Sequence, residues 1–277
     1  DYAQLARFDR PIGWWLLFWP CAWALLLAGG AGRWGLLALL LLGSIAMRGA
    51  GCVYNDVVDA DLDRQVARTA LRPVASGRVS KRAAVVWLLA LCLVGLAVLL
   101  QLPRVAQWVA LGSLALVAAY PFMKRITGWP QAWLGMVFTW GAPVGWAAQR
   151  TDRLDVLAAL YAGSVLWCIG YDTIYACQDR EDDAMVGIGS SARSLGRHVR
   201  AGVAGFYAGA VACWAGAVWL LRPDWVALLA LLPAALHLGW QAGTLQPDDG
   251  DNALARFRSN RTLGLLLAGA CWVVGNA

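Results

Sequence analysis

Two stretches of this sequence concentrate oxygen-bearing side chains at the spacing of a helix. The first, CVYNDVVDADLD, places an asparagine and four aspartates directly after a long apolar run. At about 100° of rotation per residue, Asn55, Asp59 and Asp63 follow steps of four and share one helix face. Asp56 lies near Asp63 on that face, whereas Asp61 points elsewhere. The stretch therefore predicts a single stripe of hard oxygen ligands.

The second stretch, YDTIYACQDREDD, shows the same property about half a chain later. Steps of three and four align its oxygen-bearing side chains on one face: Asp172, Tyr175, Asp179 and Asp183. Like charges at four-residue spacing repel one another, and a divalent cation resolves that conflict. Carboxylates with water are the ligands that Mg²⁺ prefers, usually together with substrate phosphates. Solvated loop charges are the weaker interpretation, because both clusters fall on the same predicted side of the membrane.

Cations lie close to these acidic stretches. The segment RTALRPVASGRVS follows the first stretch and carries Arg68, Arg72 and Arg78. The segment YPFMKR ends another apolar run with Tyr120 and Lys124. A diphosphate requires metal on some of its oxygens and arginine or lysine on the others. Anchoring of the chain by positive charge at the membrane surface is the alternative interpretation, and for Arg78 it is the better one.

Arg48 is the one charge that lies within an apolar run. It precedes Asn55 by seven residues, which places it on the same helix face but deeper in the membrane. A buried arginine in lipid needs an anionic partner or a polar cavity. Two interpretations stay open: a structural pair with a membrane carboxylate, or a site for a substrate that carries a carboxylate.

The elements that must position these residues are apolar. Of the 277 residues, 60% are hydrophobic and only 14% are charged. Apolar runs of about 18 residues mark membrane-spanning helices. Nine such runs are present: residues 12–30, 35–55, 83–101, 105–120, 132–148, 155–177, 201–221, 225–241 and 262–276. The fold class is therefore all-α, a polytopic membrane bundle, and the first run is too long for a cleavable signal peptide.

The basic residues orient this bundle. With the N-terminus in the cytoplasm, 17 of the 23 lysines and arginines fall inside and five outside, with Arg48 within a span. This asymmetry fits the positive-inside rule and an odd number of spans, so the net charge of +6 reflects topology. No basic stripe interleaved with aromatics suggests nucleic-acid binding. The seven cysteines lack a CxxC pair and the two histidines lack zinc spacing, so neither predicts disulfides or zinc.

The acidic stretches resemble the two aspartate motifs of the UbiA superfamily of membrane-embedded aromatic prenyltransferases. GCVYNDVVDADLDRQVARTALRPVASG matches the first as NDxxDxxxD, and YDTIYACQDREDD matches the second, whose DxxxD runs from Asp179 to Asp183. RPIGWWLLFWPCAWALLLA, YPFMKRITGWPQAWLGMVFTWGAPVGWAA and DREDDAMVGIGSSARSLG are similar to the bacterial members that act on 4-hydroxybenzoate. The match is dense from about residue 7 to residue 200 and then thins to hydrophobic pattern.

This resemblance implies a fold and a reaction. The fold is a single membrane-embedded domain over residues 1–277, with about nine transmembrane helices around a central cavity capped by cytoplasmic-side acidic loops. The reaction transfers a polyprenyl group from polyprenyl diphosphate to the ring carbon ortho to the hydroxyl of 4-hydroxybenzoate and releases diphosphate, a step of ubiquinone biosynthesis. The expected location is the bacterial inner membrane, with the lipid bilayer as a partner and no obligate protein partner.

The resemblance also implies a role for each candidate residue. The catalytic Mg²⁺ ligands would be Asp59, Asp63, Asp179 and Asp183. The diphosphate would be bound by Asn55, Arg68, Arg72, Tyr120 and Lys124. Supporting positions would be Asp56, Asp172 and Tyr175. Arg48 would pair with the carboxylate of the aromatic acid, and Asp179 is a candidate acceptor for the ring proton.

Rival functions stay open at this point. The same chemistry on another acceptor, such as homogentisate or dihydroxynaphthoate, depends on the shape of the cavity. An ion-coupled transporter would bind near the bilayer midplane, whereas these carboxylates cluster at the cytoplasmic ends of spans. A non-catalytic lipid-binding or scaffold protein would have no use for two acidic clusters beside phosphate-suited cations.

Overall fold

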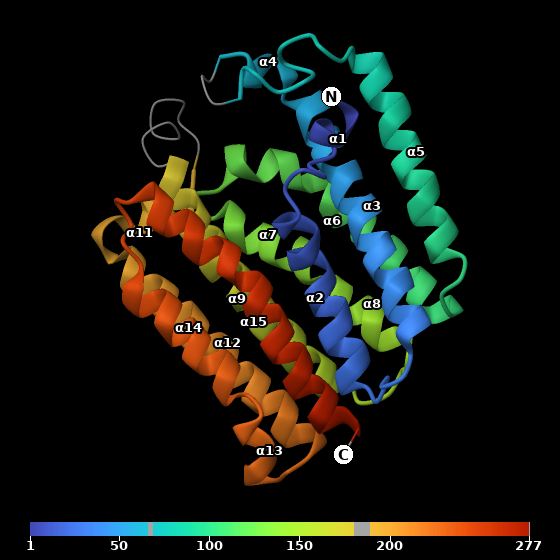
Figure 1. Ribbon diagram of the computed structural model, residues 1–277, viewed down its shortest axis with the longest axis vertical. Helices are drawn as coiled ribbons and strands as arrows, with labels where there is room; N and C mark the ends of the chain where they lie inside the picture. The colour runs from blue at the N-terminus through green and yellow to red at the C-terminus, as the bar shows by residue number, and fades with distance from the viewer. Residues whose placement is uncertain (66–68, 180–188, 277) are drawn as a thin grey trace.

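The computed structural model describes residues 1–65, 69–179 and 189–276, and the regular structure within them is helical throughout (Figure 1). The helices are, in chain order, α1 Tyr2–Leu5, α2 Ile12–Leu27, α3 Trp34–Val58, α4 Ala60–Asp63, α5 Lys81–Leu99, α6 Arg104–Ile126, α7 Pro130–Thr139, α8 Gly141–Ala147, α9 Leu154–Ala176, η1 Cys177–Asp179, α11 Ser191–Leu195, η2 Gly196–His198, α12 Val199–Leu221, α13 Trp225–Leu229, α14 Leu232–Thr244 and α15 Gly250–Asn276. The predicted all-α class is confirmed.

Each apolar run predicted from the sequence corresponds to helical structure, but three of the runs differ from single helices with the predicted bounds. The run 132–148 is divided into α7 and α8, and the run 225–241 is divided into α13 and α14. Proline explains both breaks, since Pro143 and Pro233 lack the N–H that would continue the helical ladder. The last helix, α15, begins at Gly250, well before the apolar run at residue 262, because polar residues of its first turns are helical but were not counted in that run.

The close packing of α8 on α2 depends on glycine. A Cβ atom on Gly145 would overlap the backbone carbonyl of Cys21, and one on Gly141 would overlap the sulfur of Cys21. Small residues allow transmembrane helices to approach closely, and van der Waals packing then stabilises the contact. The second half of the 132–148 run, α8, therefore packs closely on α2 through these two glycines.

The lengths and compositions of the helices suit a membrane. Five segments in the described chain are long and apolar enough to cross a bilayer: Trp34–Val58, Lys81–Leu99, Leu154–Ala176, Ser191–Leu221 and Trp225–Thr244. Two shorter apolar helices are Ile12–Leu27 and Arg104–Tyr120. The N- and C-termini lie at opposite ends of the bundle, which agrees with an odd number of crossings (Figure 1).

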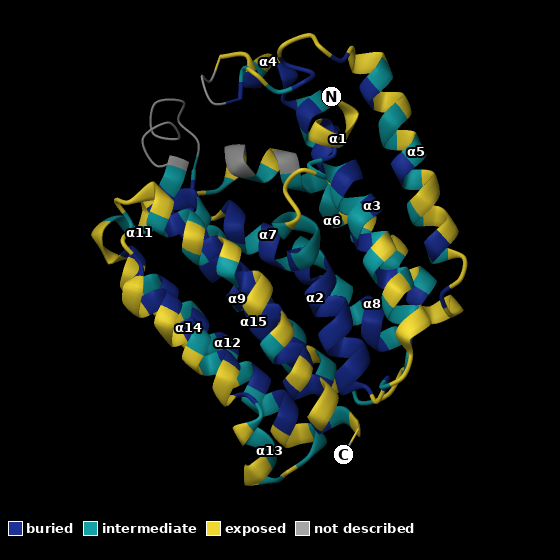
Figure 2. Cartoon of the chain, viewed as in Figure 1, coloured by how far each residue is buried: buried dark blue, intermediate teal, exposed yellow. Residues whose placement is uncertain are grey.

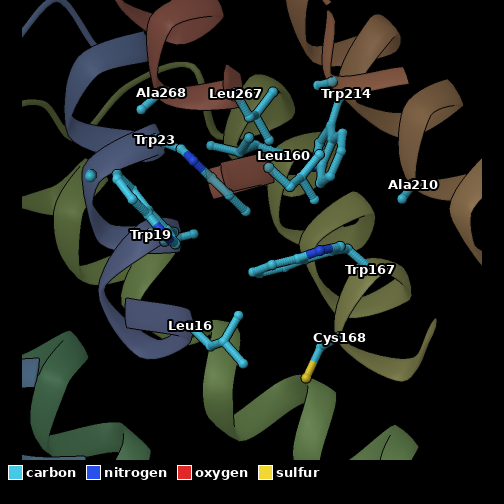
Figure 3. Packing of buried hydrophobic residues seen from close by; sticks show 14 of the residues in the cluster. Leu16, Trp19, Trp23, Leu160, Trp167, Cys168, Ala210, Trp214, Leu267 and Ala268 are labelled. Carbon is cyan, nitrogen blue, oxygen red and sulfur yellow. The ribbon is translucent and has the colours of Figure 1, made fainter. Parts of the chain in front are cut away.

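Tryptophan forms the centre of the bundle. The Trp23 ring lies 4.8 Å from the Trp167 ring and 5.6 Å from the Trp214 ring, and all three side chains are buried (Figure 3). Trp23 donates to the carbonyl of Gly264 at 2.8 Å, and Trp167 donates to Oδ1 of Asn260 at 2.7 Å. These bonds satisfy indole N–H groups away from water. They tie α2 and α9 to α15. Helix α5, by contrast, lies at the outside of the bundle with an exposed apolar face (Figure 2).

Candidate active site

The first acidic stretch and the described part of the second, up to residue 179, lie at the same end of the bundle, where α3 meets α4 and where α9 runs into η1 (Figure 1). At the first of them the helix bends at Asp59, yet the step of four survives. The Asp59 amide donates to the Asn55 carbonyl at 2.9 Å, and the Asp63 amide donates to the Asp59 carbonyl at 2.8 Å. The predicted stripe of Asn55, Asp59 and Asp63 is thus present in the backbone.

Burial separates the four aspartates of this stretch. Asp56, Asp59 and Asp63 are buried, with Asp59 only 1% exposed. Asp61 is exposed and pairs with Arg64 at 3.0 Å and Lys81 at 3.4 Å. Desolvation of a carboxylate is costly unless it has partners, so three buried aspartates within eight residues require compensating groups.

Two arginines provide that compensation for Asp56 and Asp63. Nη2 of Arg7 lies 3.0 Å from both carboxylate oxygens of Asp56. Nη1 of Arg72 lies 3.2 Å from Oδ1 of Asp56 and 2.8 Å from Oδ2 of Asp63. Arg72 therefore holds two steps of the acidic stripe together. Its predicted contact with a diphosphate stays a prediction, although its position beside Asp63 is compatible with that role.

Arg7 is the residue that sequence reasoning missed. From the sequence, Arg7 counted only among the basic residues on the predicted cytoplasmic side, and 49 residues separate it from Asp56. Its backbone has a left-handed conformation, with φ of 59°, in the turn between α1 and α2. The sequence signal was indirect: a buried aspartate demands a cation, but nothing in the helical period says which one.

Replacing Arg7 with alanine should destabilise this end of the bundle. Asp56 would keep only Arg72, and removal of a partner from a buried ion pair costs about 2–4 kcal/mol. We expect a lower midpoint of thermal unfolding in detergent. Arg10→Ala is the matched control, because Arg10 is exposed in the same segment and lies 3.8 Å from an exposed Asp9. Equal midpoints for the two variants would contradict the importance of the Arg7 pair.

Arg48 lies deeper, where several helices converge. Its Cζ is 5.4 Å from the ring centre of Phe138 in α7, and its Nη1 contacts the sulfur of Cys52. Its Nε is buried without a hydrogen-bond partner, and among the described residues Arg48 forms no ion pair. No described carboxylate therefore lies within ion-pair distance of Arg48, although Asp172 of α9 and Arg48 have Tyr120 and Tyr171 as common electrostatic neighbours.

Tyr120 of α6 lies near Arg48. The hydroxyl of Tyr120 is within electrostatic range of Arg48 and also of Asp172 in α9. Helices α3, α6 and α9 therefore contribute polar groups to one region of an otherwise apolar interior. Asp172 is partly buried, and Tyr175 packs on Phe257 of α15 with ring centres 4.7 Å apart.

Some predicted residues lie beyond what the structure describes. Arg68 and Asp183 are outside the described residues, and so are the side chains of Lys124 and Asp179. In residues 1–65, 69–179 and 189–276, no three histidine, cysteine, aspartate or glutamate side chains come together as a metal site would require. Two of the four predicted ligands fall outside that search, so the Mg²⁺ site stays a prediction.

The described residues can still be tested for their fit to Mg²⁺. Asp59 and Asp63 are buried carboxylates about one helical turn apart, and such a pair suits a hard divalent cation. Asp56 suits it less, because Arg7 and Arg72 already contact its oxygens. The division of roles predicted from the sequence, with Asp56 in support, is compatible with this arrangement.

Apolar helices that carry buried carboxylates and arginines at one end, with the partly buried Arg48 below, define a class of site: one within a membrane protein that suits anionic ligands. The profile of the UbiA prenyltransferase family matches residues 17–266, and the chain belongs to that family. The resemblance recognised in the two aspartate motifs is confirmed.

Alignments with named relatives cover nearly the whole chain. A mitochondrial 4-hydroxybenzoate polyprenyltransferase of Drosophila melanogaster is 44% identical over 270 residues, which cover 96% of this chain and 69% of that protein. The enzyme of the same name from Caenorhabditis elegans is 41% identical, with 96% and 76% covered. Both relatives are mitochondrial. The prediction that the chain is a multi-pass membrane protein is confirmed.

Solved structures share the fold. The apo structure of a UbiA homolog from Aeropyrum pernix K1 has a TM-score of 0.76 and 26% identity, with 94% of this chain and 97% of that chain covered. A UbiA homolog from Archaeoglobus fulgidus, solved bound to GPP and Mg²⁺, has a TM-score of 0.72 and 17% identity, with 100% and 99% covered. A member of the fold thus binds Mg²⁺ together with a prenyl diphosphate.

Proposed function

We propose that this chain is a 4-hydroxybenzoate polyprenyltransferase. It transfers a polyprenyl group from polyprenyl diphosphate to the ring carbon ortho to the hydroxyl of 4-hydroxybenzoate and releases diphosphate, as in ubiquinone biosynthesis. The relatives that carry this name, at 44% and 41% identity over 96% of the chain, support the reaction. The observation that favours an acceptor with a carboxylate is Arg48, a partly buried cation with no ion pair among the described residues, and the names of the relatives favour 4-hydroxybenzoate among such acids.

The acidic end of the bundle handles the diphosphate. Breaking the allylic C–O bond is easier when fixed cations meet the negative charge that develops on the leaving group. Arg72 lies at that end beside Asp63, and Arg68, Lys124, Asn55 and Tyr120 are the further proposed contacts. Mg²⁺, held by Asp59, Asp63, Asp179 and Asp183, would neutralise further charge on the diphosphate.

Arg48 orients the acceptor. A guanidinium binds a carboxylate through two parallel N–H donors, which fixes the direction of the attached ring. With the carboxylate on Arg48, the hydroxyl end of the ring points away from it and the ortho carbon is presented to the allylic carbon. Orientation of two reactants contributes several kcal/mol, up to about 7–11 kcal/mol in the best cases. Asp179 stays the candidate acceptor for the ring proton.

The surroundings protect the reaction. An allylic cation reacts with water, so water must be excluded from the acceptor region. Phe138 and Cys52 border Arg48 with apolar or weakly polar atoms. We further propose that the acidic end faces the cytoplasm of a bacterial inner membrane, as the distribution of basic residues indicates, and that the chain acts as one membrane-embedded domain.

Mass spectrometry of the products tests this function. Membranes that contain the protein should convert 4-hydroxybenzoate and a short allylic diphosphate into the ring-prenylated acid. Chelation of divalent cations should abolish the product, and added Mg²⁺ should restore it. Full activity after exhaustive chelation would contradict the metal assignment.

The same assay separates the rival acceptors. Homogentisate and dihydroxynaphthoate also carry a carboxylate, so Arg48 alone does not distinguish them from 4-hydroxybenzoate. We expect 4-hydroxybenzoate to give the highest kcat/KM in a panel of the three acids. Turnover of another acid without turnover of 4-hydroxybenzoate would overturn the proposed acceptor.

A further inference from the structure

The guanidinium of Arg48 packs against α2 at a position that has no side chain. A Cβ atom on Gly13, in the first turn of α2, would lie 2.7 Å from Nε, 3.3 Å from Nη2 and 3.4 Å from Cζ of Arg48. Carbon atoms do not approach a nitrogen as closely as 2.7 Å without displacement of one of them. Phe138 of α7 borders the same guanidinium at 5.4 Å. Arg48 is thus held between α2 and α7.

The backbone gives no other reason for glycine at this position. The positive φ angles of the described glycines occur at Gly29, Gly32, Gly77 and Gly196, and Gly13 is not among them. Glycine is the poorest helix former after proline, so alanine would favour α2 more. The absence of a side chain at Gly13 therefore costs helix stability and gains only the space that Arg48 occupies.

The packing on Gly13 also determines which donors of Arg48 remain for a ligand. Among the residues that the structure describes, the buried Nε has no hydrogen-bond partner and Nη1 contacts the sulfur of Cys52, which is a weak acceptor. A carboxylate would therefore be received mainly by the terminal Nη groups, whose direction depends on how flat the guanidinium lies against α2.

We propose that Gly13 is a positioning residue for the aromatic acid. Its missing side chain lets Arg48 lie against the first turn of α2 and aims the Nη groups at the carboxylate of the acceptor. This inference rests on the proposed function, in which Arg48 binds that carboxylate. A methyl group at Gly13 displaces the guanidinium by several tenths of an ångström and tilts its donors away from the acid.

Gly35 provides a matched control. It lies in the first turn of α3, as Gly13 lies in the first turn of α2, and a Cβ on Gly35 would have no atom within 4 Å. Gly13→Ala and Gly35→Ala both replace a helical glycine with the best helix former, so neither should lower the midpoint of thermal unfolding. Gly13→Ala should therefore lose function without a fall in the midpoint of thermal unfolding.

The experiment is a steady-state analysis of the full chain in membranes, with each substrate varied in turn. We expect Gly13→Ala to raise the KM for 4-hydroxybenzoate about ten- to a hundredfold and to leave the KM for a short allylic diphosphate unchanged. Gly35→Ala should match the unsubstituted protein. An unchanged KM for the acid, or equal increases for both substrates, would overturn the proposal.

A double-mutant cycle with Arg48→Lys tests the contact itself. A lysine has no planar guanidinium to collide with the new methyl, so Gly13→Ala should have a smaller effect in the Arg48→Lys background. Additive effects would overturn the proposal. If the unsubstituted protein does not prenylate 4-hydroxybenzoate, the proposed function fails; if it does, and only Gly13→Ala is without effect, the role of Gly13 alone fails.

Discussion

Replacing Asp59 with alanine should abolish prenyl transfer, with kcat reduced about a thousandfold or more. Asp59 lies in the middle of the acidic stripe, bonded through its backbone to Asn55 and Asp63, and its side chain is 1% exposed. Its loss removes a buried carboxylate from the proposed diphosphate and metal site, while Arg7 and Arg72 still hold Asp56. Product formation under saturating substrates measures the effect.

Asp61→Ala is the matched control for this experiment. Asp61 belongs to the same stretch, but it is exposed and pairs with Arg64 and Lys81 on the surface. It should retain activity near that of the unsubstituted protein. Asp59→Asn, which keeps the volume and removes the charge, should be as inactive as Asp59→Ala while the chain stays folded. Robust activity in Asp59→Ala or Asp59→Asn would refute the site. Asp183→Ala should also be inactive, a prediction that rests on the sequence motif.

Replacing Arg48 with alanine should separate the two substrates. We expect the KM for 4-hydroxybenzoate to rise about 100-fold, because charge-assisted hydrogen bonds to the carboxylate are lost. The KM for the allylic diphosphate should change little, since the acidic end of the bundle keeps its ion pairs. Equal losses for both substrates would refute the assignment of Arg48 to the acid.

The same variant distinguishes a binding role from a structural one. Arg48 forms no ion pair among the described residues, so its removal breaks none there and costs only the packing of its side chain. The unfolding midpoint of Arg48→Ala should therefore fall less than that of Arg7→Ala, which loses the pair with Asp56. A large fall in that midpoint would indicate that Arg48 supports the bundle instead of the acceptor.

Local properties of the chain determined much of this picture. Hydrophobicity summed over about 18 residues located the spans, because a helix in lipid must be apolar along its whole length. The step of four in Asn55, Asp59 and Asp63 predicted their common face, because the helical period is a property of consecutive residues. The break before α14 could also have been read from Pro233, which cannot continue the ladder.

Only the tertiary structure decided which distant groups meet. Arg7 reaches Asp56 across 49 residues, and Arg72 folds back onto Asp56 and Asp63 from the following loop. Arg48 is held between Gly13 of α2 and Phe138 of α7. An arginine side chain is long and has many rotamers, so its partners depend on how helices pack and not on the periodicity of its own segment. Sequence pattern therefore specified the helices and their polar faces, whereas the packing of distant segments determined that Arg7 and Arg72 are the cations that meet Asp56 and Asp63.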